Sequence, residues 1–211
     1  MKKFELTNEF ITNMFGTKLF RIRALVEFGD VEAGELGGYV EKESNLGHDD
    51  NAWVYDNAWV YGNARVYGDA QVSGDARVYD NAWVYGDAQV SGDARVYGNA
   101  RVYGNAWVYG NAWVYGNAWV YGNALVCSDE DYAYAHGFGS FNRTTTFFRL
   151  KDGGVGVRCG CFYGTLAQFR DKIRETHGET KKAQEYLMLA DLMELRFEED
   201  ENEVGNRKYV E

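Results

Sequence analysis

The middle of the chain is a six-residue repeat, and this repeat constrains the fold more than any other feature of the sequence. Thirteen consecutive hexads run from Ala52 to Asp129, most of them of the form Ala-x-Val-Tyr-Gly-Asn. Self-similarity at a fixed period indicates a chain that stacks one small structural unit many times. The 211 residues include 25 glycines and no proline. This composition fits repeated tight corners, because glycine tolerates a positive φ.

Each hexad predicts one short strand followed by one corner. The Ala and the Val are two residues apart, so their side chains point to the same side of a strand. The residue between them and the Tyr after the Val point the opposite way. Gly-Asn or Gly-Asp then turns the chain. Small Ala and branched Val fill a narrow interior, and the repeat therefore predicts a parallel β-helix.

A longer repeat indicates three hexads per coil. The segment 68–79 recurs unchanged at 86–97, eighteen residues later. In a triangular prism this spacing places Gln71 and Ser73 directly under Gln89 and Ser91. A duplication unrelated to the coil would give the same spacing. The repeat region then amounts to about four coils, roughly 20 Å tall at ~4.8 Å per rung.

The same stacking aligns the outward residues of the hexads into three columns. These columns are Trp53, Gln71, Gln89 and Trp107; Trp59, Arg77, Arg95 and Trp113; and Arg65, Trp83, Arg101 and Trp119. Stacked aromatic and guanidinium planes contribute about 0.5–1 kcal/mol per contact. Large aromatic faces are also typical contact surfaces, because monomers rarely expose them. Sugar binding is a further interpretation, although no carboxylate stands among the outward residues. We expect an interaction surface that includes Trp59, Trp83, Trp113, Trp119, Tyr61 and Tyr115.

The hexads and three segments outside them carry a resemblance to a known family. The hexads resemble the hexapeptide-repeat, left-handed β-helix family, best known from trimeric acyltransferases. The segments 33–46 (AGELGGYVEKESNL), 139–146 (GSFNRTTT) and 159–166 (CGCFYGTL) resemble a narrower group of bacterial and phage hexapeptide-repeat proteins assigned as acyltransferases. The resemblance covers nearly the whole chain. It implies a left-handed coil and a homotrimer, and it implies function only by analogy.

The flanking segments predict a cap at each end of the β-helix. A partly alternating run at 18–26 predicts a strand, and 144–150 and 155–161 predict a hairpin around the turn 151–154. Thr165 and Gln168 form a capping box for a helix that Gly178 ends, and a second helix follows. We expect an N-terminal strand and cap over 1–33, the β-helix over 34–129, a connector over 130–143 and an α+β module over 144–211. The acidic run 198–201 is expected to be a solvated end.

Composition narrows the range of partners. The net charge of −10 makes nucleic acid an unexpected partner, although a local basic groove is compatible with it. No apolar stretch reaches membrane-spanning length, and the polar, acidic start does not resemble a signal peptide. Cys127, Cys159 and Cys161 form no disulfide framework, and we expect Cys159 and Cys161 to be small core residues rather than metal ligands. A cytoplasmic location is expected, in a bacterium or, for a phage-encoded protein, in its host.

The chain lacks the catalytic pattern that the resemblance implies. Acyltransferases of that family place a histidine base on the coils, beside a surface for coenzyme A. Between Ala52 and Val126 there is no His, Lys, Glu or insertion. His48 is expected in an exposed turn and His177 at a helix end. His136 is the one catalytic candidate, and its alternative role is that of a connector residue.

A polar cluster near the end of the repeat is the best candidate for a ligand site. Arginines with neighbouring hydroxyls and amides hold phosphates and nucleotides. The candidates are Ser140, Asn142, Arg143, Thr145, Arg149 and Arg158. The alternative is that these residues tie the C-terminal module to the last coil.

The sequence therefore favours a non-catalytic binding protein that forms a homo-oligomer, a trimer by family resemblance. Its partner would be a host protein or a small anionic, nucleotide-like ligand. The second interpretation is a coenzyme-A-dependent acyltransferase that uses His136 at a subunit boundary. The third is a structural spacer that binds nothing. No metal or cofactor is expected except coenzyme A under the second interpretation.

Overall fold

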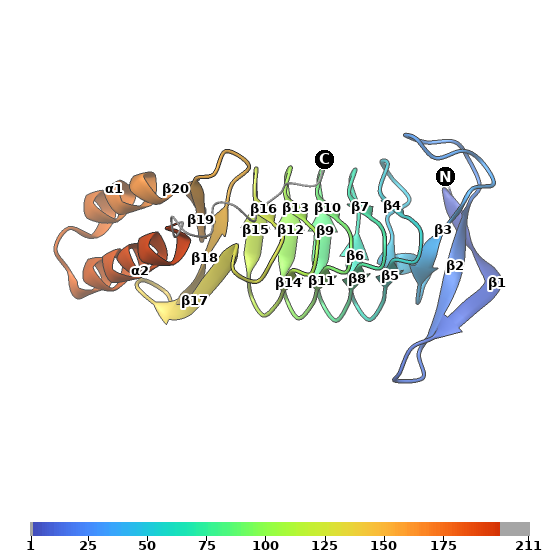
Figure 1. The fold of residues 1–211 in the computed structure, drawn as a ribbon, viewed down its shortest axis with the longest axis horizontal. Coiled ribbons are helices and arrows are strands. Elements are labelled where there is room, and N and C mark those ends of the chain that lie inside the picture. Colours follow the sequence, from blue (N-terminus) through green and yellow to red (C-terminus); the bar gives the residue numbers. More distant parts are fainter. Residues whose placement is uncertain (1, 199–211) are drawn as a thin grey trace.

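The computed structural model describes residues 2–198 and shows a parallel β-solenoid with a cap at each end (Figure 1). Each coil has three faces, which we call the first, second and third face. The first face contains β4 (Trp53–Val54), β7 (Gln71–Val72), β10 (Gln89–Val90), β13 (Trp107–Val108) and β16 (Leu125–Val126). The second contains β5 (Trp59–Val60), β8 (Arg77–Val78), β11 (Arg95–Val96) and β14 (Trp113–Val114). The third contains β6 (Arg65–Val66), β9 (Trp83–Tyr85), β12 (Arg101–Tyr103) and β15 (Trp119–Tyr121).

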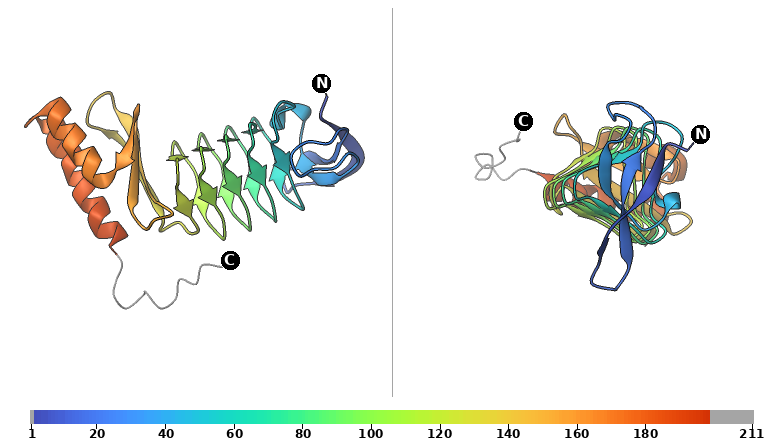
Figure 2. Two further views of the ribbon diagram at one scale, coloured as in Figure 1. Left: turned by 90° about the horizontal axis from the view of Figure 1, so that it is seen from above. Right: turned by 90° about the vertical axis from the view of Figure 1, so that its right-hand side faces the viewer.

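The register of these strands confirms three hexads per coil. Gln71 pairs in parallel with Gln89, and Arg101 pairs with Trp119, each partner being eighteen residues along the chain. Seen along the axis, the successive coils superimpose (Figure 2). All three predicted outward columns are therefore formed. The predicted parallel β-helix is correct.

The interior of the solenoid consists of the Ala and Val side chains of the hexads. All thirteen alanines and all thirteen valines, from Ala52 to Val126, are fully buried at 0% exposure. Burial of each valine contributes about 1.5–3 kcal/mol. The corners follow in the left-handed region, where glycine is favoured. Asp80 takes the place of a corner glycine at a φ of 60°, and its Oδ2 accepts a hydrogen bond from Gly98 N at 3.3 Å.

Identical side chains on the outer surface of the coils form three ladders. Two of them are tyrosine ladders, with ring centroids 4.3–5.4 Å apart: Tyr61, Tyr79, Tyr97 and Tyr115, and Tyr67, Tyr85, Tyr103 and Tyr121. The third is an asparagine ladder, in which each Nδ2 donates to Oδ1 of the next rung at 3.1–3.4 Å: Asn63, Asn81, Asn99 and Asn117. Stacking and hydrogen bonding thus repeat at every rung, outside a fully apolar interior.

An antiparallel hairpin and its loops cap the N-terminal end. β1 (Phe4–Thr12) pairs with β2 (Lys18–Ala24), which pairs with β3 (Leu36–Val40), and β3 runs parallel to β5; the short helix η1 (Glu43–Asn45) follows. Trp53 was expected on the outward surface but is 0% exposed. Its ring lies under the cap, against Phe4 and Phe28. His48, expected in an exposed turn, is half-buried and stacks on Phe4 with ring centroids 4.4 Å apart.

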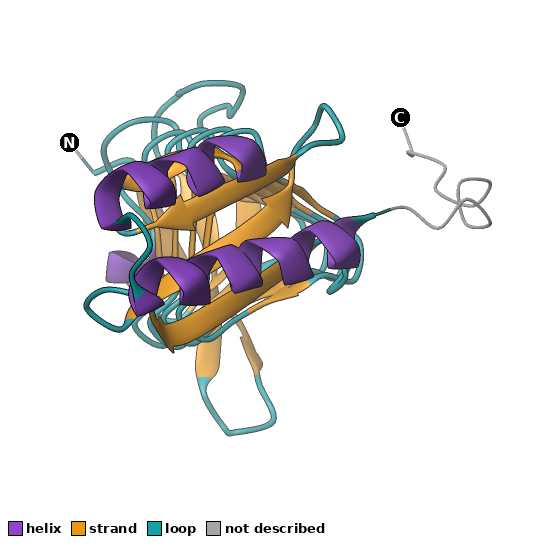
Figure 3. Cartoon of the chain, turned by 90° about the vertical axis from the view of Figure 1, so that its left-hand side faces the viewer, coloured by secondary structure: helices purple, strands orange, loops and turns teal. Residues whose placement is uncertain are grey.

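A four-stranded antiparallel sheet and two helices cap the C-terminal end. The sheet has the order β17 (Tyr132–Phe138), β18 (Arg143–Arg149), β19 (Val155–Cys159) and β20 (Phe162–Thr165). Helices α1 (Leu166–His177) and α2 (Lys181–Phe197) cover its outer face (Figure 3). The predicted hairpin and both helices are present, and the Thr165–Gln168 capping box is formed. Strand β17 lies in the segment that the sequence indicates as a connector.

Two remaining expectations concern the acidic run and membrane-spanning segments. Residues 199–201 of the acidic run lie outside the described residues. Among the helices that the structure describes, none combines the length and the apolar character needed to cross a membrane.

Gly98→Ala tests the left-handed corners. Gly98 has a φ of +70°, and a Cβ there would lie 3.1 Å from Gly116 N. We expect Gly98→Ala to lower the free energy of unfolding by about 1–2 kcal/mol, measured by urea or thermal unfolding. Gly98→Asp is the matched control. It should cost less, because Asp80 adopts this conformation one coil earlier. Equal unfolding midpoints for the two variants would contradict this account.

The tyrosine ladders predict an alkaline loss of stability. Burial, with a contribution from the neighbouring tyrosines, raises the pKa of Tyr79 and of Tyr85 to about 12. In the unfolded chain tyrosine titrates near pH 10, so the unfolded state loses these protons first. The stabilisation is therefore fully present below about pH 10 and is lost as the pH rises towards about 12. Ultraviolet titration of tyrosinate, with unfolding measured at each pH, checks this. Tyr79→Phe keeps the ring and should reduce the slope, and an unchanged slope would refute it.

Candidate functional site

The three faces of the solenoid differ in charge, and the third is the most basic. The residues that directly precede the alanines form a column along each corner, which we call the corner column. On the first face, the corner column holds two aspartates and the outward column holds no arginine. On the second face, two arginines are matched by Asp75 and Asp93 in the corner column. On the third face, Arg65 and Arg101 stand beside the uncharged asparagine ladder. Two carboxylates lie at the corner leading into this face, and both accept backbone hydrogen bonds: Asp80 Oδ2 from Gly98 N and Glu41 Oε2 from Gly62 N.

A groove lies where the third face meets the C-terminal sheet. It has a volume of about 520 Å³. We call it the basic groove, and its lining residues are Asn99, Arg101, Asn117, Trp119, His136, Phe141, Asn142, Arg143, Thr144 and Gly160. None of these ten lining residues is acidic, whereas the chain as a whole has a net charge of −10. The groove is therefore a local reversal of the protein's charge.

Two arginines enter the groove from opposite walls. On the solenoid wall, the Arg101 guanidinium lies 4.9 Å from the ring centroids of both Trp83 and Trp119. On the hairpin wall, the exposed Arg143 lies 4.9 Å from the ring of Phe141. Gly160 makes room for Arg143, because any Cβ at that position would collide with its Nη1. Stacked guanidiniums keep their N–H edges available for a carboxylate or a phosphate.

The hairpin loop beside the groove holds a backbone conformation that bulky residues rarely adopt. Phe141 has a φ of 62° and Asn142 a φ of 48°. The Phe141 side chain is 82% exposed. At Phe141 such a conformation costs about 1–3 kcal/mol, whereas asparagine tolerates it, and strained residues concentrate at ligand sites. The loop thus presents an aromatic ring to solvent at the rim of the basic groove.

The structure brings together only part of the predicted polar cluster. Asn142 and Arg143 line the basic groove. The backbone N–H of Ser140 donates a hydrogen bond to Tyr186 Oη of α2 at 3.1 Å. Thr145 is 1% exposed, and its hydroxyl donates to Cys159 Sγ at 3.2 Å. The hydroxyl of Thr145 is therefore buried inside the module and is not available to a ligand.

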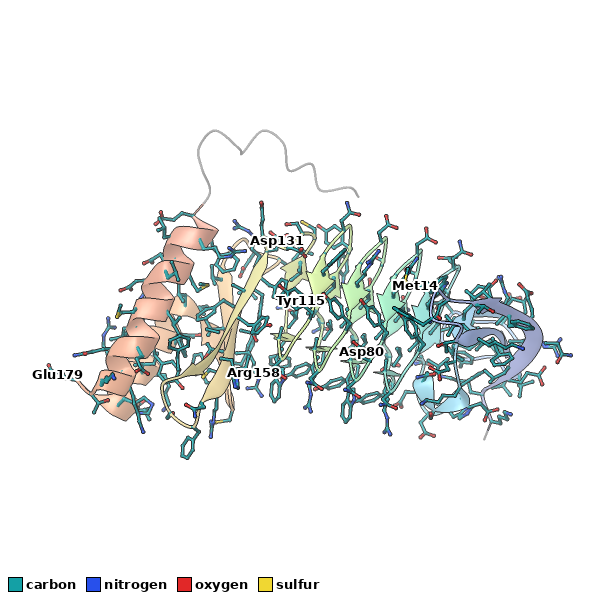
Figure 4. All side chains as sticks on the ribbon, turned by 90° about the horizontal axis from the view of Figure 1, so that it is seen from below. Met14, Asp80, Tyr115, Asp131, Arg158 and Glu179 are labelled. Carbon is teal, nitrogen blue, oxygen red and sulfur yellow. The ribbon has the colours of Figure 1, made fainter. Side chains whose placement is uncertain are left out.

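The remaining two arginines lie on opposite sides of the C-terminal sheet. Arg149 Nε is 3.2 Å from Asp131 Oδ1, and its guanidinium lies over Phe197 of α2. Arg158 faces the solenoid instead, where its Nε donates to Tyr103 Oη at 3.0 Å. Figure 4 shows Asp131 and Arg158 well apart in the junction between the sheet and the coils. The three arginines of the predicted cluster do not form one site, and Arg149 has a structural role.

His136 lies in the same groove as Arg143. It is exposed on β17, and its Nδ1 is 3.0 Å from Thr144 Oγ1. Thr144 lines the groove beside it. No carboxylate contact to His136 is present among the described residues, so the ring lacks the acidic partner that orients many catalytic histidines.

Several groove residues were not singled out as candidates by the sequence. Asn99, Arg101 and Asn117 belong to the regular coils, where they are indistinguishable from other hexads. Phe141 is an ordinary loop residue until its positive φ is known. The eighteen-residue register was one signal that could have indicated these residues. Only the third face combines outward arginines with an asparagine before every alanine.

The predicted aromatic interaction surface is distributed over two faces. Trp113 and Tyr115, on and beside the second face, are each 40% exposed. Trp59 is half-buried and lines a smaller hollow of about 270 Å³ with Arg77 and Tyr39. The other three predicted residues, Tyr61, Trp83 and Trp119, are also half-buried. Their ring faces are largely occupied by ladder neighbours.

The cysteines differ from each other in exposure. Cys159 ends β19 and is half-buried, whereas Cys161 is exposed, because Gly160 turns the chain between them. The expectation that both are core residues is wrong for Cys161. Within residues 2–198, no three His, Cys, Asp or Glu side chains come together in a group that could hold a metal ion.

Comparison with known protein families supports the repeat architecture. The YdcK Beta solenoid repeat model matches residues 58–70, 70–86, 88–104, 94–110, 100–116 and 106–122. The chain is a β-solenoid repeat protein. These matches lie within the regular coils and cover less than half of the chain, so neither cap is included. No curated protein matches the chain. The resemblance to hexapeptide-repeat acyltransferases is not confirmed by these comparisons.

Arg149→Met tests the structural role of Arg149. Asp131 is 2% exposed and Arg149 is 13% exposed, so removal of the arginine leaves a buried carboxylate without its ion partner. We expect the free energy of unfolding to fall by about 3 kcal/mol. Arg143→Ala is the matched exposed control, and it should change stability by less than about 0.5 kcal/mol. Thermal unfolding of both variants checks this, and equal losses would contradict the separation of the two roles.

Proposed function

We propose that this protein is a non-catalytic binding protein whose basic groove holds the anionic part of a ligand. The observation that carries the proposal is that Arg101 of the solenoid and Arg143 of the hairpin line the same groove, which has no acidic lining residue. Two guanidinium forks can bind a carboxylate or phosphate in a bidentate manner. The volume of about 520 Å³ is also within the range of small-molecule sites.

Phe141 favours a ligand that carries a ring next to its anionic group. Its side chain is largely exposed and lies beside Arg143, so one neighbour offers stacking and the other offers charge. A nucleotide-like ligand has both features. The strained backbone at Phe141 is consistent with a loop selected for ligand contact rather than for stability.

His136 is the observation that favours a second candidate, a coenzyme-A-dependent acyltransferase. The imidazole lies in the groove with the arginines, where the phosphates of coenzyme A would find basic partners. Acyl transfer also requires a base that is oriented towards the acceptor. Among the described residues, the hydrogen bond of the His136 ring is to Thr144 and not to a carboxylate, so binding without catalysis is the better supported function.

The oligomer and its partners belong to the same proposal. Exposed Trp107, Trp113 and Tyr115 give the solenoid apolar patches that a second copy or a host protein would cover. A homotrimer is the form that the family resemblance implies. These features fit one role, the sequestration of a host protein or a small anion. The protein would act in the cytoplasm of a bacterium or, for a phage protein, of its host.

Binding of small anions to purified protein tests the groove. Native mass spectrometry first identifies co-purifying molecules and the subunit number. Calorimetric titration with adenosine monophosphate, glucuronate and inorganic phosphate then compares the wild type with Arg143→Ala. We expect the variant to bind the preferred anion about tenfold more weakly, since a charged hydrogen bond is lost.

Arg77→Ala is the matched control, because Arg77 also stacks on a tryptophan but lies on the second face. It should leave anion affinity unchanged. Binding that is unaffected by Arg143→Ala would place the ligand elsewhere. Absence of binding to every anion would favour the structural spacer. Acyl transfer from acetyl coenzyme A that is abolished by His136→Ala would replace the proposal with the enzymatic alternative.

A further inference from the structure

The basic groove is one end of a column that runs the height of the third face. In this column Arg65, Trp83, Arg101 and Trp119 stand on successive rungs. The Arg65 guanidinium lies 5.9 Å from the Trp83 ring, and Arg101 lies 4.9 Å from both tryptophans. Arg158 covers the last ring at 5.4 Å. We call this the arginine–tryptophan column.

The tryptophan faces in this column are already occupied. Trp83 stands between Arg65 and Arg101, and Trp119 stands between Arg101 and Arg158. The neighbouring tyrosines, from Tyr67 to Tyr121, stack on each other in the same way. Bases of single-stranded nucleic acid need open aromatic faces on which to stack. The column offers ring edges instead, so it is poorly suited to nucleic acid.

The edges that the third face presents are rich in hydrogen-bond donors. Each stacked guanidinium keeps N–H groups at its outer edge. Each ladder asparagine is exposed and uses one amide N–H for the next rung, which leaves a second N–H for a ligand. Donors arranged along a line favour a linear ligand with acceptors along its length, and the arginines favour negative charges within it.

The charges on the third face repeat every second rung. Arg65 and Arg101 are separated by one tryptophan rung, so they lie about 9.6 Å apart along the axis at ~4.8 Å per rung. An equatorially linked pyranose lengthens a glycan by close to one rung. A glycan with an anionic sugar at every second position therefore matches both periods at once. A ligand with a charge on every unit would place half of its charges over indole edges.

We infer that the third face binds a linear acidic glycan in which anionic and neutral sugars alternate, with one end of the chain in the basic groove. The inference rests on the proposed function, because it takes the groove as the anion site. It adds the ligand class and the direction in which the ligand extends. Carboxylates of the glycan meet Arg101 and Arg65, and the hydroxyls between them meet the asparagine ladder.

Hyaluronan fragments test the inference, because uronate alternates in them with a neutral amino sugar. A disaccharide spans the groove alone, and a hexasaccharide extends past Arg65. Calorimetry on the wild-type protein should show the hexasaccharide binding at least about tenfold more tightly. Arg65→Ala, an exposed residue outside the groove, should remove this gain and leave disaccharide affinity unchanged. Arg143→Ala should weaken both fragments, and Arg77→Ala on the second face should weaken neither.

The outcomes separate this inference from the proposed function. If both fragments bind equally and Arg65→Ala has no effect, the extended ligand is refuted, while a loss in Arg143→Ala still supports the groove. If Arg143→Ala also has no effect, the groove fails as well. Tighter binding of oligothymidylate of similar length would replace the glycan with nucleic acid. Equal binding of neutral chitin hexasaccharide would show that the arginines do not select the ligand.

Discussion

In the coils, each side chain lies directly above the residue eighteen positions earlier, at the ~4.8 Å spacing of parallel strands. This register determines what every other part of the solenoid can do. Inside, it places valine on valine and alanine on alanine, so the inward side chains of the thirteen hexads contain no polar atom. Outside, it turns a repeated tyrosine or asparagine into a continuous ladder. A substitution at one rung is therefore felt first by the rungs above and below it.

Much of the fold could be predicted because the repeat encodes it locally. The alternation within a hexad decides which side chains are inside, and the recurrence of 68–79 at 86–97 decides which residues stack. The caps were harder to predict, because they depend on contacts between distant segments. Trp53 has the same local pattern as Trp59, yet Phe4 and Phe28 bury it. Strand β17 likewise depends on its pairing with β18, and the local sequence pattern does not predict that pairing.

The candidate site was predictable only in part, for the same physical reason. Chemistry alone identified Arg143 and His136, since no other Lys, Arg or His stands between Arg101 and Arg143. Residue chemistry could not show on which side of the C-terminal sheet each arginine lies, because the position of that sheet was not known from the sequence. Arg149 and Arg158 both belong to the C-terminal module, but one pairs with Asp131 and the other with Tyr103. Arg101 was hidden by its regularity, because its position becomes special only when the hairpin packs beside it.

The coil of three hexads also has a consequence for how such a protein changes over generations. Gain or loss of eighteen residues adds or removes one whole coil and returns every side chain to its own face. A change that is not a multiple of eighteen residues does not return the C-terminal sheet to its face, and it takes the hairpin away from the third face. The number of coils thus sets the length of the solenoid in steps of one rung. Duplication can lengthen the face that leads to the groove while both ends keep their local structure.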